Sequence, residues 1–210
     1  MNDNAEPVSG LPSRDRGWEL LNQYTKKPGL IGHALAVEAA MRAYAAKFDG
    51  DETAWGLVGL LHDFDYERWP DPPDHTRKGA EILLERGVEI LEAQGYPEWF
   101  RRAVLSHAAY TGVPRESDLE KALFACDELC GFLTACALVT PDRSLHAVKV
   151  KSVRKKMKSK AFAASVNRQD IIDGATDLGV DLDQHIDFVL EALCGVASRL
   201  GLGGTSSSVP

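Results

Sequence analysis

The chain has 210 residues, a formal net charge of −7 and a sequence pI near 5.4. This acidic balance argues against general nucleic-acid binding, and no run of about 18 apolar residues is present that would span a membrane. The polar N-terminus lacks the apolar segment of a secretion signal, so we expect a cytoplasmic protein.

Apolar residues recur at helical spacing along most of the chain, and the alternation typical of strands is absent. The pattern predicts an all-α fold with helices at about 15–24, 29–48, 52–63, 76–86, 88–94, 97–109, 116–139, 144–160, 168–178 and 182–200. Asp51 and Asp181 stand where side chains cap the starts of two of these helices. We expect one domain at residues 15–200, with flexible ends at 1–14 and 201–210.

Two cysteines lie on one face of a predicted helix, since Cys126 and Cys130 are four residues apart. Such a pair can ligate a metal, but free cysteines are more often small, buried, apolar core residues. No C-x-x-C pair is present, which argues against a zinc ribbon or a thioredoxin-like motif. We therefore expect both thiols to be core residues.

Histidines and aspartates recur at the core-facing edges of successive predicted helices. A lone histidine beside an apolar face is usually a hydrogen-bonded core residue, and acids at the end of an apolar helix are costly to bury without a neutralising partner. Imidazole and carboxylate together are the ligand set of borderline divalent ions. The combination therefore predicts a metal site built from His33, His62, Asp63, His75, His107 and Asp127.

The order of four of these residues resembles the HD-domain family of metal-dependent phosphohydrolases. An early helix carries His33, the pair His62-Asp63 follows an apolar run, and a late helix carries Asp127. The resemblance covers about residues 28–140 and implies a single HD-type helical bundle, to which the helices at 144–200 are an addition. Phe64-Asp65 stands here where Ile-Gly often follows the family's pair, which suggests a less studied subgroup.

The family also implies a cofactor, a divalent transition metal such as Mn, Fe, Co, Ni or Zn. Members that hold two ions have two further histidines between the pair and the last aspartate, and His75 and His107 resemble these. By this resemblance one ion is held by His33, His62, Asp63 and Asp127, and Asp63 bridges to a second ion. One or two ions per chain are therefore expected.

The activity implied is hydrolysis of a small phosphomonoester or nucleotide by a metal-activated water, with Asp63 as a catalytic residue. Asp65 and Glu67 follow the pair closely enough to serve as the leaving-group acid or as partners of the ligands. Alternatively, either acid forms an ion pair with Arg68 or Arg77.

Cationic residues are expected to bind the phosphate of a small anionic substrate. Arg77 and Lys78 directly follow His75, and residues 149–160 contain seven cations and no acid. The first cations of that segment are our candidates, namely Lys149, Lys151 and Arg154. The alternative is a solvated helix face balanced by acids elsewhere. No nucleic-acid or membrane partner is expected, and a homodimer is left open.

Two alternative functions are a di-iron oxygenase and a non-catalytic module. Di-iron oxygenases of the phosphonate-cleaving kind share the ligand set but carry a tyrosine and an acid shortly before the first ligand. Here Tyr24 is present, but no acid lies between it and His33. A non-catalytic nucleotide-sensing or scaffold module would lose ligands, whereas all six are present. His146 and His185 fall outside the motif and are expected to be surface or structural residues.

Overall fold

The structure, a computed structural model, describes residues 10–68, 70 and 96–204. Within these ranges every named element is a helix, apart from an isolated antiparallel bridge between Ser144 and Gly203. The prediction of an all-α fold is confirmed. None of the described helices is long and apolar enough to cross a membrane.

The predicted helices at 76–86 and 88–94 lie outside the described residues, together with His75, Arg77 and Lys78. Contacts divide the chain into two units, residues 1–123 and 124–210, and the boundary falls within a helix. Each unit is described by itself, and the organisation as one domain stays a prediction.

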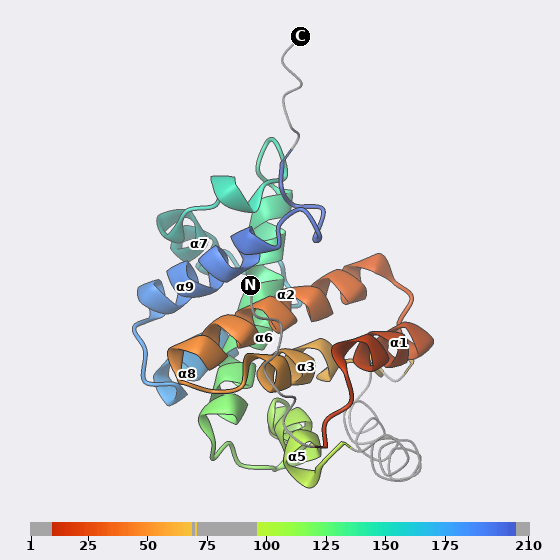
Figure 1. The fold of residues 1–210 in the computed structure, drawn as a ribbon. Coiled ribbons are helices and arrows are strands. Elements are labelled where there is room, and N and C mark those ends of the chain that lie inside the picture. The colour runs from red at the N-terminus through yellow and green to blue at the C-terminus, as the bar shows by residue number, and fades with distance from the viewer. Residues whose placement is uncertain (1–9, 69, 71–95, 205–210) are drawn as a thin grey trace. The chain divides into compact units, whose positions relative to one another are not determined.

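Among its described residues, the first unit contains four complete α-helices and the start of a fifth. They are α1 (Arg14–Tyr24), α2 (Pro28–Lys47), α3 (Glu52–Leu61), α5 (Glu98–Ser106) and α6 (Asp118–Leu138), which continues into the second unit. Figure 1 shows α3 between α2 and α5, and α3 contacts α1, α2 and α5. The helix that precedes the His-Asp pair is therefore the central helix of this unit.

Helix α3 is apolar on every side, and all residues from Ala54 to Leu61 are buried. A helix of this kind is stable only when other elements surround it. Its start is fixed by Asp51, whose carboxylate accepts a hydrogen bond from the Ala54 N–H at 2.9 Å, as predicted. The helix ends at Leu61, two residues earlier than expected, and so delivers His62 into the core.

Helices α2 and α3 approach each other at backbone distance. A Cβ atom on Gly59 would lie 2.9 Å from the Val37 carbonyl oxygen and 2.9 Å from Met41 Cγ. Only glycine permits this approach, because real Cβ contacts are longer. The close packing brings the C-terminal end of α3 against the helix that carries His33.

Helix α1 is held to α2 by a bidentate ion pair. Arg14 Nε and Nη2 lie 2.6 and 2.8 Å from the two Glu38 carboxylate oxygens, and Arg42 Nη2 lies 3.2 Å from Oε1. The Glu38 side chain is only 5% exposed, so two guanidinium groups neutralise a carboxylate that would be costly to bury alone. The hydrogen bond to Glu38 raises the pKa of Arg14, which keeps the pair charged.

The second unit contains the rest of α6, a 3-10 turn at Leu145–Ala147, and the helices α7 (Val150–Met157), α8 (Arg168–Asp177) and α9 (Leu182–Gly195). Helix α8 packs closely on α6 at Gly174. A Cβ atom on this residue would lie only 2.6 Å from Ala125 Cα. The buried His185 of α9 donates from Nε2 to the Ala125 carbonyl at 2.9 Å. His185 thus has a structural role, as expected.

The continuous helix predicted at 144–160 is wrong. The chain forms the short turn at 145–147, becomes extended at Val148 and Lys149, and only then enters α7. The cause is tertiary: the Leu145 N–H donates to the Leu202 carbonyl at 2.9 Å, and Ser144 bridges to Gly203. This pairing redirects the chain.

The end of the last helix also differs from the expectation of residue 200. Helix α9 stops at Gly195, and the chain then forms successive turns. Leu202 is 4% exposed and donates its N–H to the Ala197 carbonyl at 2.8 Å. Leu202 is therefore packed within the second unit, whereas residues 205–210 lie outside the described residues.

The two cysteines of α6 behave as apolar core residues. Cys126 and Cys130 are both 0% exposed. Burial raises the pKa of each thiol well above its ordinary value, so both stay protonated at neutral pH. A protonated thiol is a poor metal ligand.

Candidate metal centre

Two histidines of the centre are held in the same way, each directly after the end of a helix. His62 directly follows α3, and its Nδ1 lies 2.7 Å from the carbonyl of Gly59, one turn back. His107 directly follows α5, and its Nδ1 lies 2.5 Å from the carbonyl of Val104. A carbonyl only accepts hydrogen bonds, so in each ring Nδ1 carries the proton and Nε2 keeps its lone pair. Each helix end therefore fixes an imidazole in the tautomer suited to metal binding.

The carboxylate of Asp63 faces both imidazoles. Asp63 Oδ2 lies 3.7 Å from His62 Nε2, and Oδ1 lies 3.2 Å from His107 Nε2. The two rings stand edge to face, with centroids 5.2 Å apart. The histidine side chains are 0% and 4% exposed, whereas Asp63 is 20% exposed. The cluster is thus buried on the imidazole side, and its carboxylate is the part that solvent reaches.

Helix α2 contributes a third imidazole. The half-buried His33 ring lies edge-on to that of His62, with centroids 5.2 Å apart. One ligand atom from each of His33, His62 and Asp63 lies within 4.8 Å of the others. The remaining candidate, the half-buried Asp127 of α6, belongs to the second unit, and its part in this centre stays a prediction. Nitrogen and carboxylate donors from separate helices fit a borderline divalent ion.

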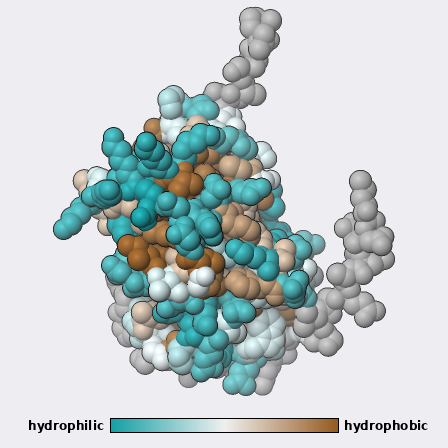
Figure 2. Space-filling model, turned by 90° about the vertical axis from the view of Figure 1, so that its left-hand side faces the viewer, coloured by the Kyte–Doolittle hydropathy of each residue, from teal (hydrophilic) through white to brown (hydrophobic). Residues whose placement is uncertain are grey.

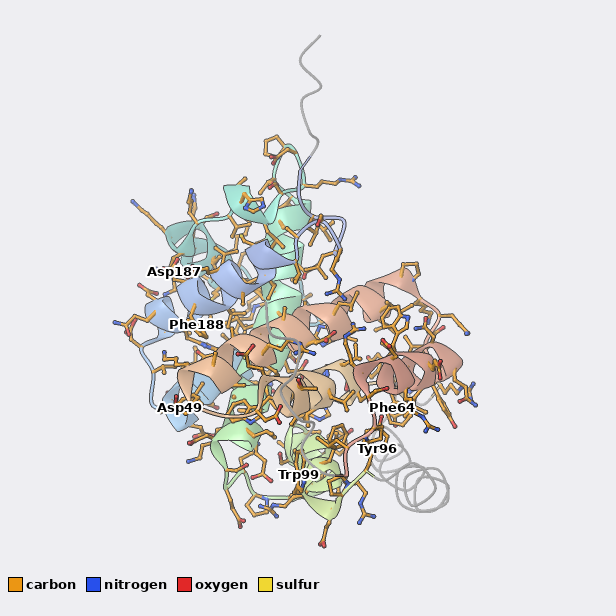
Figure 3. The ribbon with its side chains drawn as sticks, in the orientation of Figure 1. Asp49, Phe64, Tyr96, Trp99, Asp187 and Phe188 are labelled. Atoms are coloured by element: carbon orange, nitrogen blue, oxygen red, sulfur yellow. The ribbon has the colours of Figure 1, made fainter. Side chains whose placement is uncertain are left out.

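The turn after Asp63 is tied to the connection between α1 and α2. Thr25 Oγ1 donates to the Phe64 carbonyl at 2.7 Å, and Arg68 Nη2 donates to the Gln23 carbonyl at 2.9 Å. Phe64, which is labelled in Figure 3, is 1% exposed. Its ring packs edge-on against that of Tyr24, with centroids 5.3 Å apart. These contacts hold the backbone that carries Asp63.

Glu67 caps the start of α2. Its Oε2 accepts hydrogen bonds from the backbone N–H groups of Lys26 and Lys27 at 2.6 and 2.9 Å. Both bonds lower the pKa of Glu67, and the bond from Lys27 has the larger effect. The sequence alone did not predict this capping role. A signal was present, because α2 begins at Pro28 and Lys27 offers no capping side chain, so a remote acceptor was needed.

The other described residues of the predicted site lie in different surroundings. Asp65 is buried at 1% exposure in the turn after the pair. Lys149 and Lys151 are exposed at the start of α7, and Arg154 Nε lies 3.1 Å from Asp183 Oδ1. A catalytic role for Asp65 and Glu67, and substrate binding by Lys149, Lys151 and Arg154, stay predictions.

Fold and cluster together define an all-α protein with a histidine–aspartate centre suited to a divalent metal. Residues 30–130 match the family model of the HD domain, so this segment of the chain is an HD domain. That family consists mostly of metal-dependent hydrolases, and its members bind divalent metals. Comparisons with curated proteins and with solved structures gave no match.

Proposed function

We propose that this protein is a metal-dependent phosphohydrolase that acts on a small phosphorylated substrate, either a phosphomonoester or a nucleotide. The observation that carries the proposal is the position of Asp63 between two imidazoles of fixed tautomer. In this tautomer each Nε2 presents a lone pair, which repels the carboxylate that it faces unless a cation lies between the two groups.

The proposed ligands are His33, His62, Asp63 and Asp127 for one ion, with His107 beside Asp63 for a second. A bound divalent ion supplies Lewis acidity and lowers the pKa of its water to about 7. Asp63 would contribute a carboxylate oxygen beside each of two histidines, because its two oxygens face His62 and His107.

The chain's own residues would then orient the centre and control access to it. The backbone carbonyls of Gly59 and Val104 hold the two imidazoles, and burial of His62 and His107 excludes water from their side of the cluster. The exposed side of Asp63 leaves an approach for substrate. The carboxyl of Asp65, two residues further on, is our candidate for protonating the leaving group.

The test combines metal analysis with a panel of phosphomonoesters, phosphodiesters and nucleotides. Wild-type protein is expected to retain transition metal and to release phosphate from at least one member. Asp63→Ala is expected to lose turnover and most of the metal while keeping its helical circular dichroism. Asp15→Ala is the matched control, because Asp15 is an exposed acid of the same unit in the first turn of α1.

Two outcomes would overturn the proposal. Equal turnover and metal content in wild type and Asp63→Ala would show that the cluster is not the site of hydrolysis. Oxygen consumption by the iron-loaded protein, with no phosphate release from any substrate, would replace hydrolysis with the oxygenase alternative.

A further inference from the structure

The second unit separates its charges by sign along the chain. Residues 149–160 carry seven cations and no acid, whereas residues 169–198 carry seven acids and no Lys or Arg. Subtracting those seven cations from the 24 Lys and Arg leaves 17 cations against 31 acids in the rest of the chain. The chain thus carries a strongly basic segment and an excess of acids elsewhere. Two copies of such a chain can pair the basic segment of one with acids of the other.

Helix α7 displays the cations on one face. Its inward face is apolar and includes Val153, which is 0% exposed. Its outward face consists of the exposed residues Lys151, Arg154, Lys155 and Lys158. The last of these, Lys158, is the residue that caps the C-terminal end of the helix. These positions repeat at intervals of three and four, so they form one stripe. We call this stripe the basic face of α7.

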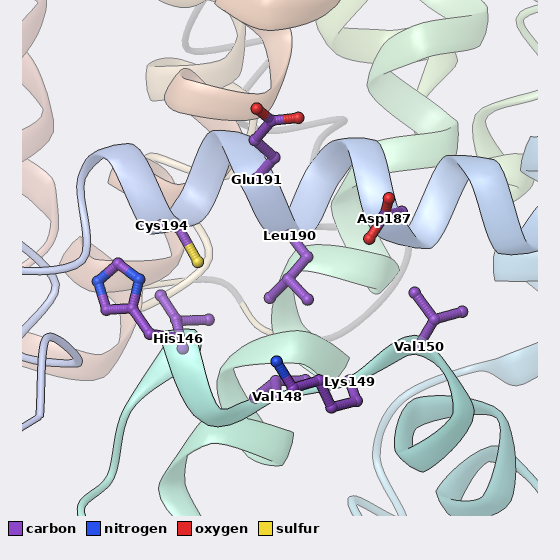
Figure 4. Close-up of a pocket in the computed structure, with 9 residues that line it drawn as sticks. His146, Val148, Lys149, Val150, Asp187, Leu190, Glu191 and Cys194 are labelled. Carbon is purple, nitrogen blue, oxygen red and sulfur yellow. The ribbon is translucent and has the colours of Figure 1, made fainter.

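Only one edge of α7 is neutralised by α9 of the same chain. Arg154 pairs with Asp183 at 3.1 Å. Lys149, just before α7, lines a cleft of about 450 Å³ together with Asp187 and Glu191 of α9 (Figure 4). Within the ranges that the structure describes, three lysines of the basic face make no ion pair, namely Lys151, Lys155 and Lys158.

Helix α8 displays acids in a matching stripe. Asp170, Asp173 and Asp177 repeat at intervals of three and four, and Asp173 and Asp177 are exposed. The buried residues of α8, Ile171, Gly174 and Ala175, lie to one side of this stripe, and Gly174 packs on α6. Ile172, beside the acids, is 40% exposed and adds an apolar contact point. Figure 2 likewise shows hydrophilic side chains interspersed with smaller apolar patches on one face of the molecule.

We propose that the basic face of α7 docks on α8 of a second copy of this chain, forming a two-fold symmetric dimer. Counted from Lys151, the lysines stand at steps of zero, four and seven residues. Counted backwards from Asp177, the aspartates stand at the same steps. Two antiparallel helices therefore oppose three charge pairs over about 10.5 Å. Two-fold symmetry makes this contact twice.

Charge complementarity favours a second copy over an anionic membrane. A lipid surface would attract α7 but repel the acids of α8 and α9 that belong to the same unit. A second copy meets the cations of α7 with acids, and the acids of α8 with cations. The overall charge of −7 opposes this association only weakly at physiological salt, where the Debye length is about 8 Å.

The first test is sedimentation velocity of the full chain at two ionic strengths. We expect a dimer at about 0.1 M salt, with a dissociation constant at least about tenfold larger at about 1 M, where the Debye length falls from about 10 Å to about 3 Å. A chain that stays monomeric at low salt would overturn the proposal. So would a monomer that instead co-sediments with phosphatidylserine vesicles in a salt-dependent way.

The second test is a charge swap between the two faces. K151E/K155E and D173K/D177K are each expected to weaken self-association at least about tenfold, because each homodimer then opposes like charges. An equimolar mixture of the two variants is expected to regain a wild-type dissociation constant. In that heterodimer, every contact again pairs opposite charges.

The matched control is R143E/R199E, which makes the same change in net charge at two exposed arginines of the same unit. It is expected to keep the wild-type dissociation constant, and circular dichroism checks that all variants fold. Weakening by the control as strong as that by K151E/K155E would overturn the proposal. Failure of the mixture to associate would do the same. None of these readouts depends on phosphohydrolase activity.

Discussion

Residues with the same chemistry take different roles here because of what their backbone neighbours offer. His62 and His107 each meet a carbonyl one turn back, which fixes the tautomer that leaves Nε2 as an acceptor. His185 instead donates from Nε2 to the Ala125 carbonyl, which leaves Nε2 without a lone pair for a metal. All three rings are buried, so burial alone does not distinguish a ligand from a structural histidine.

Glu67 gives a residue-scale prediction of pH dependence. Its pKa is lowered in the folded protein by hydrogen bonds from Lys27 and Lys26, relative to an ordinary value of 4.5. Its contribution to stability is therefore present above pH 4.5 and is lost as the pH falls through the lowered folded pKa. Glu67→Ala is expected to lower the melting temperature at pH 7 and to differ less from wild type as the solution becomes more acidic.

Thermal melts of both proteins between neutral pH and about pH 3 check this prediction, since a glutamate of ordinary pKa is mostly ionised at the first pH and mostly protonated at the second. Glu19→Ala, an exposed acid on α1, serves as the control and is expected to show little change. A Glu67→Ala deficit that grows on acidification would contradict the capping role.

At the scale of elements, the fold depends on helices that approach closely at glycine. Gly59→Ala would place a methyl group against the backbone of Val37 in α2. The backbone has little freedom to yield, so the free energy of unfolding is expected to fall by about 1–3 kcal/mol. Because His62 is anchored to the Gly59 carbonyl, metal affinity should fall as well.

Denaturant unfolding and metal titration measure the two effects of Gly59→Ala. Gly32→Ala is the control, because a Cβ there meets nothing within 4 Å and alanine favours a helix by up to about 1 kcal/mol. The control should be at least as stable as wild type. A Gly59→Ala protein of unchanged stability would mean that α2 and α3 separate without cost.

At the scale of the whole molecule, a buried cluster of acids and imidazoles links metal binding to stability. If metal binds only the folded chain, a hundredfold excess over the dissociation constant stabilises it by about 2.7 kcal/mol. For a chain of this size that corresponds to a rise in melting temperature of about 5–10 °C. Chelation is expected to reverse the rise.

Melting curves with chelator, and with Mn²⁺ or Zn²⁺ added back, test this linkage. The same additions to Asp63→Ala should leave its melting temperature unchanged within about 1–2 °C, since that shift would correspond to less than 1 kcal/mol. An equal metal-induced rise in both proteins would locate the stabilising ion elsewhere in the chain.

The sequence by itself determined the helical class and the order of most helices, because apolar spacing and capping residues are local signals. It also indicated the HD domain, since the order of His33, His62-Asp63 and Asp127 is written along the chain. Spacing predicts which residues are candidates for one site. It does not predict which ring nitrogen carries a proton.

Tertiary contacts decided what local signals did not contain. The pairing of Leu145 with Leu202 broke a helix that its own residues favour, and Glu67 caps a helix about 40 residues away along the chain. The Gly59 and Val104 carbonyls selected the tautomers of two histidines. Each of these depends on a partner whose position is set by packing, and packing is a property of the folded chain rather than of any short segment.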